Sequence, residues 1–313
     1  MKIFERKKDG NRRSFYFCGK KFLSYKKGPI EKNNFEIYDE IKKYSYVLDS
    51  KFETQHVQNI DYQNCIWQYW GQGVDEAPEL VKKCFASVDN CCQHRKIIRL
   101  DDSNIDNYIE IPNYMKEKVQ AGIMKRAHYA DYLRTCLLVK YGGTWIDATV
   151  YLTDCIPQEI ENSDFFVFKP IAYSECKKVP SMKMLKLLDR IPTYLSSFLC
   201  MSNWFIHSKA NNRILNLTKS FLEQYWENEQ GAFDYFFYHY FVTYAVLNDE
   251  KSRLIYEAMP NIANRNPHLM QNVLVDDFDK ELFEELKFLS SIHKLTYKQT
   301  DNKKSFLWYI LSN

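Results

Sequence analysis

The sequence lacks the features of several protein classes. Its nine cysteines include no Cys-x-x-Cys pair, and Cys91 and Cys92 are adjacent, which is a poor pattern for a disulfide framework. No apolar run reaches the roughly 18 residues that a membrane-spanning helix needs, and no signal-peptide pattern is present. We find no internal repeat and no low-complexity linker. These absences favour a cytoplasmic globular protein with reduced thiols.

Length and composition fit one large α/β domain, or one domain with a smaller appendage. The 313 residues are 45% hydrophobic and 27% charged, which is ordinary for a globular protein. The aromatic share of 16% stands out. Aromatic side chains grip flat ligands and sugar rings, but they also fill thick cores, so both explanations stay open.

Positive charge is concentrated near the N-terminus. Residues 1–27 contain ten Lys or Arg and two acidic residues, and the rest of the chain is net acidic. We expect this segment to hold an anionic membrane surface through Lys20, Lys21, Lys26 and Lys27, with aromatic side chains entering the interface. A solvated β-hairpin packed on the domain is the alternative. Nucleic acid is not expected as a partner, because no recognition module is present.

Local patterns predict alternating helices and strands after the basic segment. Apolar residues have helical spacing over 36–57. A strand over 64–70, a glycine-containing turn and a helix beginning near Pro78 follow, as in the opening of a nucleotide-binding α/β unit. Further elements are predicted as strands over 96–100, 144–152, 164–170 and 203–208, and as helices over 113–140 and 232–247.

Polar residues gather where the helix over 113–140 meets the strand over 144–152. Asp131 and Arg134 share one helix face, and Asp147 and Thr149 point the same way on a regular strand. Because Gly142 and Gly143 end the helix and lead into the strand, all four side chains should lie at the strand's carboxyl end, where open α/β sheets bind ligands. Arg134 can pair with a phosphate or with Asp131, and Asp147 can bind a ribose hydroxyl or a hard cation. A surface ion pair with a turn-capping aspartate would explain the same residues without a ligand.

Four segments resemble one enzyme family. The run ADYLRTCLLVKYGGTWIDATVYLTD is similar to the A-x-D-x-x-R…GG-x-Y/W-x-D-x-D core of family 32 glycosyltransferases, which have the GT-A fold. The segments IWQYWGQG…AP, MSNWFIHSKANNRIL and SIHKLTYK resemble parts of the bacterial capsular-polysaccharide-synthesis relatives, among them streptococcal capsule galactosyltransferases. They follow the family's order over residues 65–298.

The resemblance implies a fold and a domain plan. We expect an α/β protein with a GT-A, Rossmann-like nucleotide-sugar-binding mixed sheet flanked by helices, and with extra N- and C-terminal elements. The expected division is a basic N-terminal hairpin and helix over 1–58, the GT-A domain over 59–300 and a C-terminal aromatic tail over 301–313.

The resemblance also implies donor-binding and catalytic residues. Trp67 or Trp70 would stack on uracil, and one suffices because a regular strand points them to opposite sides. Asp131 and Arg134 would hold the donor sugar and its phosphate and take part in catalysis. Asn203 lies where related enzymes hold a polar residue near the anomeric carbon.

The D-x-D motif of the family is incomplete here. Asp147 matches its first carboxylate, but Thr149 replaces the second and carries no charge for a metal. In one arrangement Asp147 and His293 hold Mn²⁺ or Mg²⁺ together with the diphosphate, which suits a cation that needs few protein ligands. In the other, Lys294 and Lys298 neutralise the diphosphate without metal. The first is the expected arrangement, and the second stays open.

The implied activity is a retaining hexosyl transfer. We expect a hexose, galactose in the first instance, to move from a UDP-sugar to a polyprenyl-diphosphate-linked saccharide and to form an α-linkage during capsule or surface-polysaccharide assembly. The enzyme would be cytoplasmic and peripheral on the inner face of the cell membrane. The alternatives are a catalytically inactive nucleotide- or glycan-binding protein of the same fold, for which Thr149 is the hint, and a peripheral membrane scaffold.

Other residues allow two explanations each. His207 and His239 would contact acceptor hydroxyls or the donor phosphate, although a lone histidine among aromatics usually belongs to the core. Asp234 is either a charge favourable to a helix N-terminus or a catalytic group. His56 and His94 have no assigned role. The tail, with Trp308, is either a second interfacial anchor or a packed helix or strand.

Overall fold

The fold is that of a computed structural model. It describes residues 4–9, 12–17, 20–26, 34–52, 64–174, 199–297 and 300–312, with only the backbone described before residue 36 and at 171 and 172. The chain divides into two compact units, Met1–Glu40 and Ile41–Asn313. The predicted boundary at residue 58 lies outside the described residues, as do His56, Lys27 and Lys298.

The first unit contains a small antiparallel sheet. Its strands are β1 (Phe4–Asp9), β2 (Arg12–Phe17) and β3 (Lys20–Lys26), in the order β1-β2-β3. The basic segment therefore forms a three-stranded meander, one strand more than the predicted hairpin. Helix α1 (Asn34–Lys42) spans the division between the units.

The second unit is built on a five-stranded mixed sheet. Its strands follow the order β5-β4-β6-β9-β8, where β4 pairs in parallel with β5 and β6, and β9 is antiparallel to β6 and β8. The strands are β4 (Ile66–Tyr69), β5 (Ile97–Leu100), β6 (Gly143–Ile146), β8 (Phe165–Val167) and β9 (Phe205–Ser208). The carboxyl ends of the parallel strands thus meet at one edge of the sheet.

The predicted strand over 144–152 is interrupted. The amide of Val150 donates to the carbonyl of Asp147 at 2.9 Å, which closes a turn at Asp147–Val150. The chain then leaves the large sheet and forms β7 (Val150–Leu152), which pairs only with β10 (Ile292–Lys294) in a two-stranded antiparallel sheet. Asp147 and Thr149 therefore belong to a turn between two sheets and not to one straight strand.

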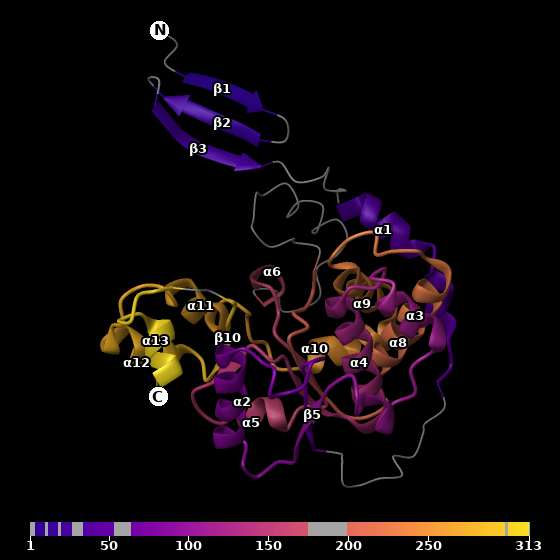
Figure 1. The fold of residues 1–313 in the computed structure, drawn as a ribbon. Coiled ribbons are helices and arrows are strands. Elements are labelled where there is room, and N and C mark those ends of the chain that lie inside the picture. The colour runs from indigo at the N-terminus through magenta and orange to yellow at the C-terminus, as the bar shows by residue number, and fades with distance from the viewer. Residues whose placement is uncertain are drawn as a thin grey trace. The chain divides into compact units, whose positions relative to one another are not determined.

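Helices flank the sheets of the second unit (Figure 1). Longer helices are α2 (Glu79–Cys91), α3 (Asn113–Gln120), α4 (Arg126–Tyr141), α8 (Arg213–Asn228), α9 (Phe237–Asn248), α10 (Glu250–Ala258) and α12 (Lys280–Leu289). Shorter helices are η1 (Ser45–Asp49), η3 (Ile105–Asn107), α5 (Gln158–Glu161), α6 (Ile171–Ser174), η4 (Asn266–His268), α11 (Leu269–Val273) and α13 (Phe306–Ser312). The helix predicted over 113–140 is two helices, because Gly122 adopts φ +71° after α3.

Two glycines allow α4 to turn directly into β6. Gly142 has φ +70° and Gly143 has φ +93°, both in the backbone region that residues other than glycine rarely adopt. A Cβ atom on Gly143 would lie 2.3 Å from the carbonyl oxygen of Cys65, so the helix end approaches the start of β4 too closely for any side chain. The indole of Trp67 donates to the carbonyl of Gly142 at 2.9 Å and closes this junction.

The C-terminal residues pack as a helix. Phe306, Leu307 and Ile310 of α13 join a hydrophobic cluster with side chains of α2, α11 and α12, while Trp308 is 46% exposed. In Figure 1 these helices gather beside β10. Of the two predicted forms of the tail, the structure has the packed helix. Within the described ranges, the helices are too short or too polar to span a bilayer.

The predicted fold class is confirmed. The second unit is a mixed α/β structure with a five-stranded mixed sheet and helices around it, consistent with a GT-A-like fold. Apolar side chains such as Ile66, Ile146 and Phe166 bury a core against this sheet. The sheet edge that carries Asp147 is therefore supported by a rigid core.

Candidate active site

A large pocket lies at the carboxyl ends of β4 and β6. Its volume is about 1280 Å³, which exceeds the roughly 300–1,000 Å³ of common small-molecule sites. The predicted residues that line it are Trp70, Asp131, Arg134, Asp147, Thr149, Asn203, His239 and Lys294. The sequence thus identified side chains from five separate segments that meet in one cavity.

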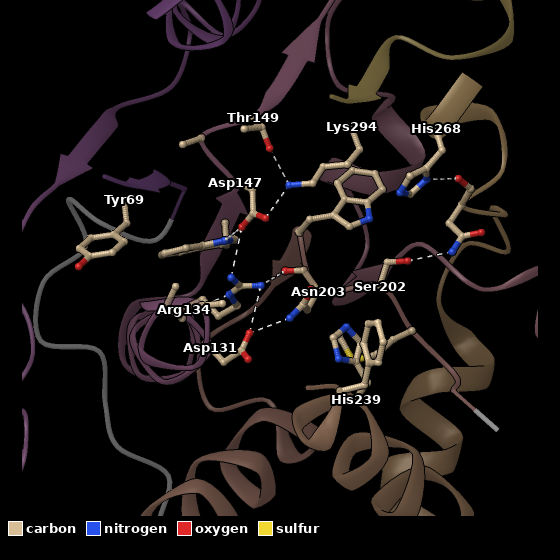
Figure 2. A pocket seen from close by; sticks show the side chains of 18 of the residues that line it. Tyr69, Asp131, Arg134, Asp147, Thr149, Ser202, Asn203, His239, His268 and Lys294 are labelled. Atoms are coloured by element: carbon tan, nitrogen blue, oxygen red, sulfur yellow. Dashed lines mark hydrogen bonds and ion pairs between the residues drawn. The ribbon is translucent and has the colours of Figure 1, made fainter. Parts of the chain in front are cut away.

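Charged side chains form a continuous network in the pocket (Figure 2). Asn203 Nδ2 donates to Asp131 Oδ1 at 2.7 Å, and Arg134 lies 3.5 Å from the same oxygen. Arg134 Nη1 also donates to the backbone carbonyl of Asn203, and Nη2 lies 3.3 Å from Asp147 Oδ1. Lys294 then joins Asp147 Oδ2 at 2.8 Å. We call these five residues, with Thr149, the charged region.

The two carboxylates of this region have opposite pKa shifts. Burial raises the pKa of Asp131 to about 7, which outweighs the opposing charge of Arg134. Burial also opposes the ionisation of Asp147, but the charges of Lys294 and Arg134 are stronger and hold its pKa below its usual value. Asp147 is therefore a permanent anion at neutral pH, and Asp131 is close to its titration point.

An aromatic pair lies beside the charged region. The rings of Trp70 and Tyr297 are 6.2 Å apart and tilted by 52°, and both line the pocket. The indole nitrogen of Trp70 is buried and has no partner among the described residues. Trp67, the other predicted stacking residue, is 0% exposed and does not line the pocket. Of the two predicted tryptophans, only Trp70 is in reach of a ligand.

The opposite side of the pocket is polar but mostly uncharged. We call Met201, Ser202, Trp204, His239, Asn264 and His268 the neutral region; Figure 2 shows Ser202, His239 and His268 on the side away from Tyr69. Asn264 Nδ2 donates to Ser202 Oγ at 3.0 Å, and Arg265 adds an exposed cation. Burial lowers the pKa of His239 to about 3, so its imidazole stays neutral.

Two buried polar atoms of the neutral region lack partners among the described residues. They are Trp204 Nε1 and His239 Nδ1, on side chains that are 6% and 8% exposed. Leaving a buried polar group without a hydrogen bond costs roughly 1–3 kcal/mol. Both atoms have almost no accessible surface, so a ligand in the pocket could reach them only after the side chains move.

The predicted metal ligands are not brought together. On β10, His293 and Lys294 point to opposite faces, and only Lys294 lines the pocket. His293 is 0% exposed, and its Nε2 lies 3.1 Å from Thr153 Oγ1. Oδ1 of Asp147 already contacts Trp145 and Arg134, and Oδ2 contacts Lys294. The residues present here therefore do not fit a protein-held divalent cation, and the described chain has no group of three or more His, Cys, Asp or Glu suited to one.

The remaining predicted residues lie away from the pocket. His207 is buried on β9, and its Nδ1 lies 2.8 Å from Thr144 Oγ1. Of its two explanations, the structure therefore has the one in which the histidine belongs to the core. Asp234 accepts a hydrogen bond from the amide of Phe236 at 2.7 Å in the loop before α9. His94 is exposed and lies 3.4 Å from Glu161.

Sequence reasoning missed several lining residues. Tyr69 is the last residue of β4 and the last but one of the predicted strand over 64–70, so its position near a carboxyl end was a usable signal. Its hydroxyl donates to Asp102 at 2.6 Å, and Arg126 donates to the same carboxylate at 2.7 Å. Asn264 and His268 come from a loop and a short helix that no periodic pattern marks. Tyr235 lies in the predicted helix over 232–247 and Tyr297 in the segment SIHKLTYK, but neither was singled out.

Comparison with known proteins identifies the family. An α/β sheet with a pocket of aromatic and cationic side chains at its carboxyl edge is the arrangement in which such folds bind nucleotides. The chain matches the family model described as "Capsular polysaccharide synthesis protein" over residues 20–310, and it belongs to this family.

One curated relative is a glycosyltransferase. Over 110 residues the chain is 28% identical to the O-glycosyltransferase PaGT of Phomopsis amygdali. This alignment covers 32% of the chain and 27% of the relative, so the chain spans well under two thirds of that protein's length.

Proposed function

We propose that the protein is a retaining glycosyltransferase that moves a hexose from a UDP-sugar to a lipid-linked saccharide and forms an α-linkage. Galactose is the first donor sugar to test, on the resemblance described above. The observation that carries the proposal is one cavity that combines a cationic, aromatic side with an uncharged polar side. Its volume, about 1280 Å³, suits a nucleotide-sugar together with part of an acceptor.

The charged region suits the donor. Uracil would stack on Trp70 beside Tyr297, because these rings lie at the edge of the cavity and next to the charges. The diphosphate would lie near Arg134 and Lys294, since a guanidinium and an ammonium are the groups that bind phosphate oxygens. The exposed Arg265 adds positive charge at the cavity, whereas the charge of Arg126 is balanced by Asp102.

The same region suits the charges that develop during transfer. Cleavage of the sugar–phosphate bond leaves negative charge on UDP and positive charge at the anomeric carbon. Arg134 and Lys294 are fixed by hydrogen bonds before any ligand enters, so they stabilise the leaving group without reorganisation. The bond from Asn203 Nδ2 to Asp131 fixes the amide plane of Asn203 near these groups, where its oxygen can face the anomeric carbon.

The neutral region suits the acceptor. Ser202, Asn264 and His268 line this side of the cavity with hydroxyl, amide and imidazole groups, which can form hydrogen bonds with the hydroxyl groups of an uncharged sugar. The acceptor would be a polyprenyl-diphosphate-linked saccharide at the inner face of the membrane. Lys20, Lys21, Lys26 and Lys27 would then hold the anionic lipid surface, with Trp308 as a second contact.

The test is UDP release from a panel of UDP-sugars without acceptor. UDP-galactose and UDP-glucose come first, each in Mn²⁺, in Mg²⁺ and in EDTA. We expect one donor to be hydrolysed, and Asp147→Ala to slow its turnover by about 100-fold, because Asp147 orients both Lys294 and Arg134. Asp164→Ala is the matched control, since Asp164 pairs with Lys209 outside the pocket.

Two results would contradict the proposal. UDP binding without hydrolysis of any donor, with or without added acceptor, would identify a nucleotide-binding protein that lacks catalysis. Absence of UDP binding by calorimetry would remove the transferase assignment altogether.

A further inference from the structure

We infer that Lys294 takes the place that a protein-held divalent cation has in a two-carboxylate site, so that the donor diphosphate binds without metal. The inference rests on the proposed function, because the diphosphate is the ligand that the cation would serve. It replaces the expected Mn²⁺ or Mg²⁺ with a side chain of this protein.

The position of the ammonium group is the first observation. Lys294 Nζ donates to Asp147 Oδ2 at 2.8 Å and to Thr149 Oγ1 at 2.7 Å (Figure 2). It therefore bridges the first and third residues of Asp147-Ala148-Thr149, where a cation would bridge two carboxylates. An ammonium group has three N–H donors, so one remains for an oxygen of a ligand in the pocket that Lys294 lines.

The charge balance is the second observation. Two carboxylates with a divalent cation are neutral, and one carboxylate with one ammonium group is neutral as well. Threonine at position 149 is therefore matched to lysine at position 294, because a second carboxylate would leave the site with an excess negative charge beside a diphosphate. The hydroxyl of Thr149 accepts from the ammonium group and orients it without adding charge.

The donor set around Asp147 is the third observation. Its Oδ1 accepts from Trp145 Nε1 at 2.8 Å and lies 3.3 Å from Arg134. A divalent cation at Asp147 would have to displace Lys294 and would meet the charge of Arg134. Asp131 is a weak substitute ligand, since burial raises its pKa to about 7 and Asn203 and Arg134 hold its Oδ1.

The backbone holds Lys294 in register with these partners. Lys294 pairs with Val150 across β10 and β7, and the amide of Leu295 donates to the carbonyl of Thr149 at 2.9 Å. The strand that carries the ammonium group is thus tied to the turn that carries Asp147 and Thr149. Lys294 is therefore already oriented to bind the diphosphate, as a cation that the protein itself supplies must be.

The test measures UDP binding by calorimetry, with UDP as the probe, in EDTA and in saturating Mn²⁺. We expect the wild-type affinity to be the same in both, within about twofold. Lys294→Met should lower the affinity in EDTA by at least about tenfold, and Lys294→Arg should retain most of it. Lys219→Met is the matched control, because Lys219 forms a comparable pair with Glu223 at 2.7 Å outside the pocket.

A second measurement needs no variant to fold. The electron paramagnetic resonance signal of free Mn²⁺ is followed while wild-type protein is added without nucleotide, and we expect no stoichiometric loss. Stoichiometric loss of the signal would overturn the inference, because it would show that the protein alone binds the cation.

The outcomes separate the inference from the proposed function. UDP binding that falls at least about tenfold in EDTA would overturn the metal-free site and leave the transferase proposal standing. Equal UDP affinity of Lys294→Met and wild type in EDTA would overturn the role of Lys294. Absence of UDP binding under every condition would remove the proposed function, and the inference with it.

Discussion

At the scale of single residues, Asp131 is the group whose protonation changes near neutral pH. Its pKa is raised to about 7 by burial, above the ordinary value of 3.8. Between these two values the unfolded chain releases a proton that the folded chain keeps, so stability falls as pH rises. Asparagine at this position does not titrate. We therefore expect the unfolding free energy of Asp131→Asn, relative to wild type, to rise between pH 4 and pH 7 by at least about 1 kcal/mol.

Urea denaturation across this pH range measures the effect. Asp249→Asn is the control of opposite sign, because hydrogen bonds from Arg213 and Ser252 outweigh burial and lower the pKa of Asp249 to about 2. The difference in unfolding free energy between Asp249→Asn and wild type should stay constant above pH 5. A constant difference for Asp131→Asn as well would mean that Asp131 titrates normally.

Trp67 and Trp70 allow a matched pair of substitutions. Trp70→Ala removes a pocket ring, so UDP affinity should fall by about 1–3 kcal/mol, the range of a base–aromatic stack. Trp67→Phe removes the hydrogen bond to Gly142 and leaves a small cavity, so unfolding free energy should fall by about 2 kcal/mol while UDP affinity is kept. Calorimetry and urea denaturation of both variants check this, and the reverse pattern would contradict the assignment of Trp70.

At the scale of elements, the junction between α4 and β6 tolerates no side chain. Gly143→Ala places a Cβ 2.3 Å from the carbonyl oxygen of Cys65 at φ +93°, so we expect a loss of more than about 2 kcal/mol of unfolding free energy. Gly231→Ala is the control, since no atom lies within 4 Å of its added Cβ and its change should stay within about 0.5 kcal/mol. Thermal or urea denaturation compares the two, and equal effects would contradict the steric argument.

The sequence predicted elements better than their ends and joints. Helical spacing and the two glycines predicted α4 and its direct connection to β6. This predicted connection was the basis for placing Asp131 and Arg134 near Asp147, where the structure has them. The turn at Asp147–Val150 was missed because Ala148 and Thr149 continue a strand-like pattern, and only the pairing of β7 with β10 reveals it. His293 was placed in the site together with Lys294, although successive residues of a strand face opposite ways.

The neutral region is the part of the site that the sequence predicted least well. Asn264 and His268 reach the pocket from the segment after α10, where no motif or period marks them. Their approach depends on tertiary packing, such as the edge-to-face contact of His268 with Trp204 at 5.4 Å. Spacing within a sequence carries no information on such contacts.

At the scale of the whole molecule, the pocket and the basic sheet belong to different units. The described lining residues run from Tyr69 to Tyr297, all in the second unit. A chain that begins at residue 34 should therefore keep its UDP affinity. It should lose most of its binding to anionic vesicles, because ten Lys or Arg lie in residues 1–27.

Co-sedimentation with phosphatidylglycerol vesicles and calorimetry with UDP test both parts of this prediction. High salt should release the full chain from the vesicles, since the attraction is screened within a Debye length. Vesicle binding by the shortened chain equal to that of the full chain would assign the membrane contact to the second unit.

The short pairing of β7 with β10 has a consequence for local unfolding. Lys294 and Asp147 are 147 positions apart, and a three-residue ladder with one ion pair joins the segments that carry them. A diphosphate that bridges Lys294 and Arg134 ties this small ladder to the core helix α4. Nucleotide binding should then slow amide hydrogen exchange in β10 as much as in the central strands, because the diphosphate must leave before β10 can open, whereas openings that leave the diphosphate bound should be unaffected. While it stays bound, the donor would therefore stabilise the attachment of the C-terminal helices to the sheet.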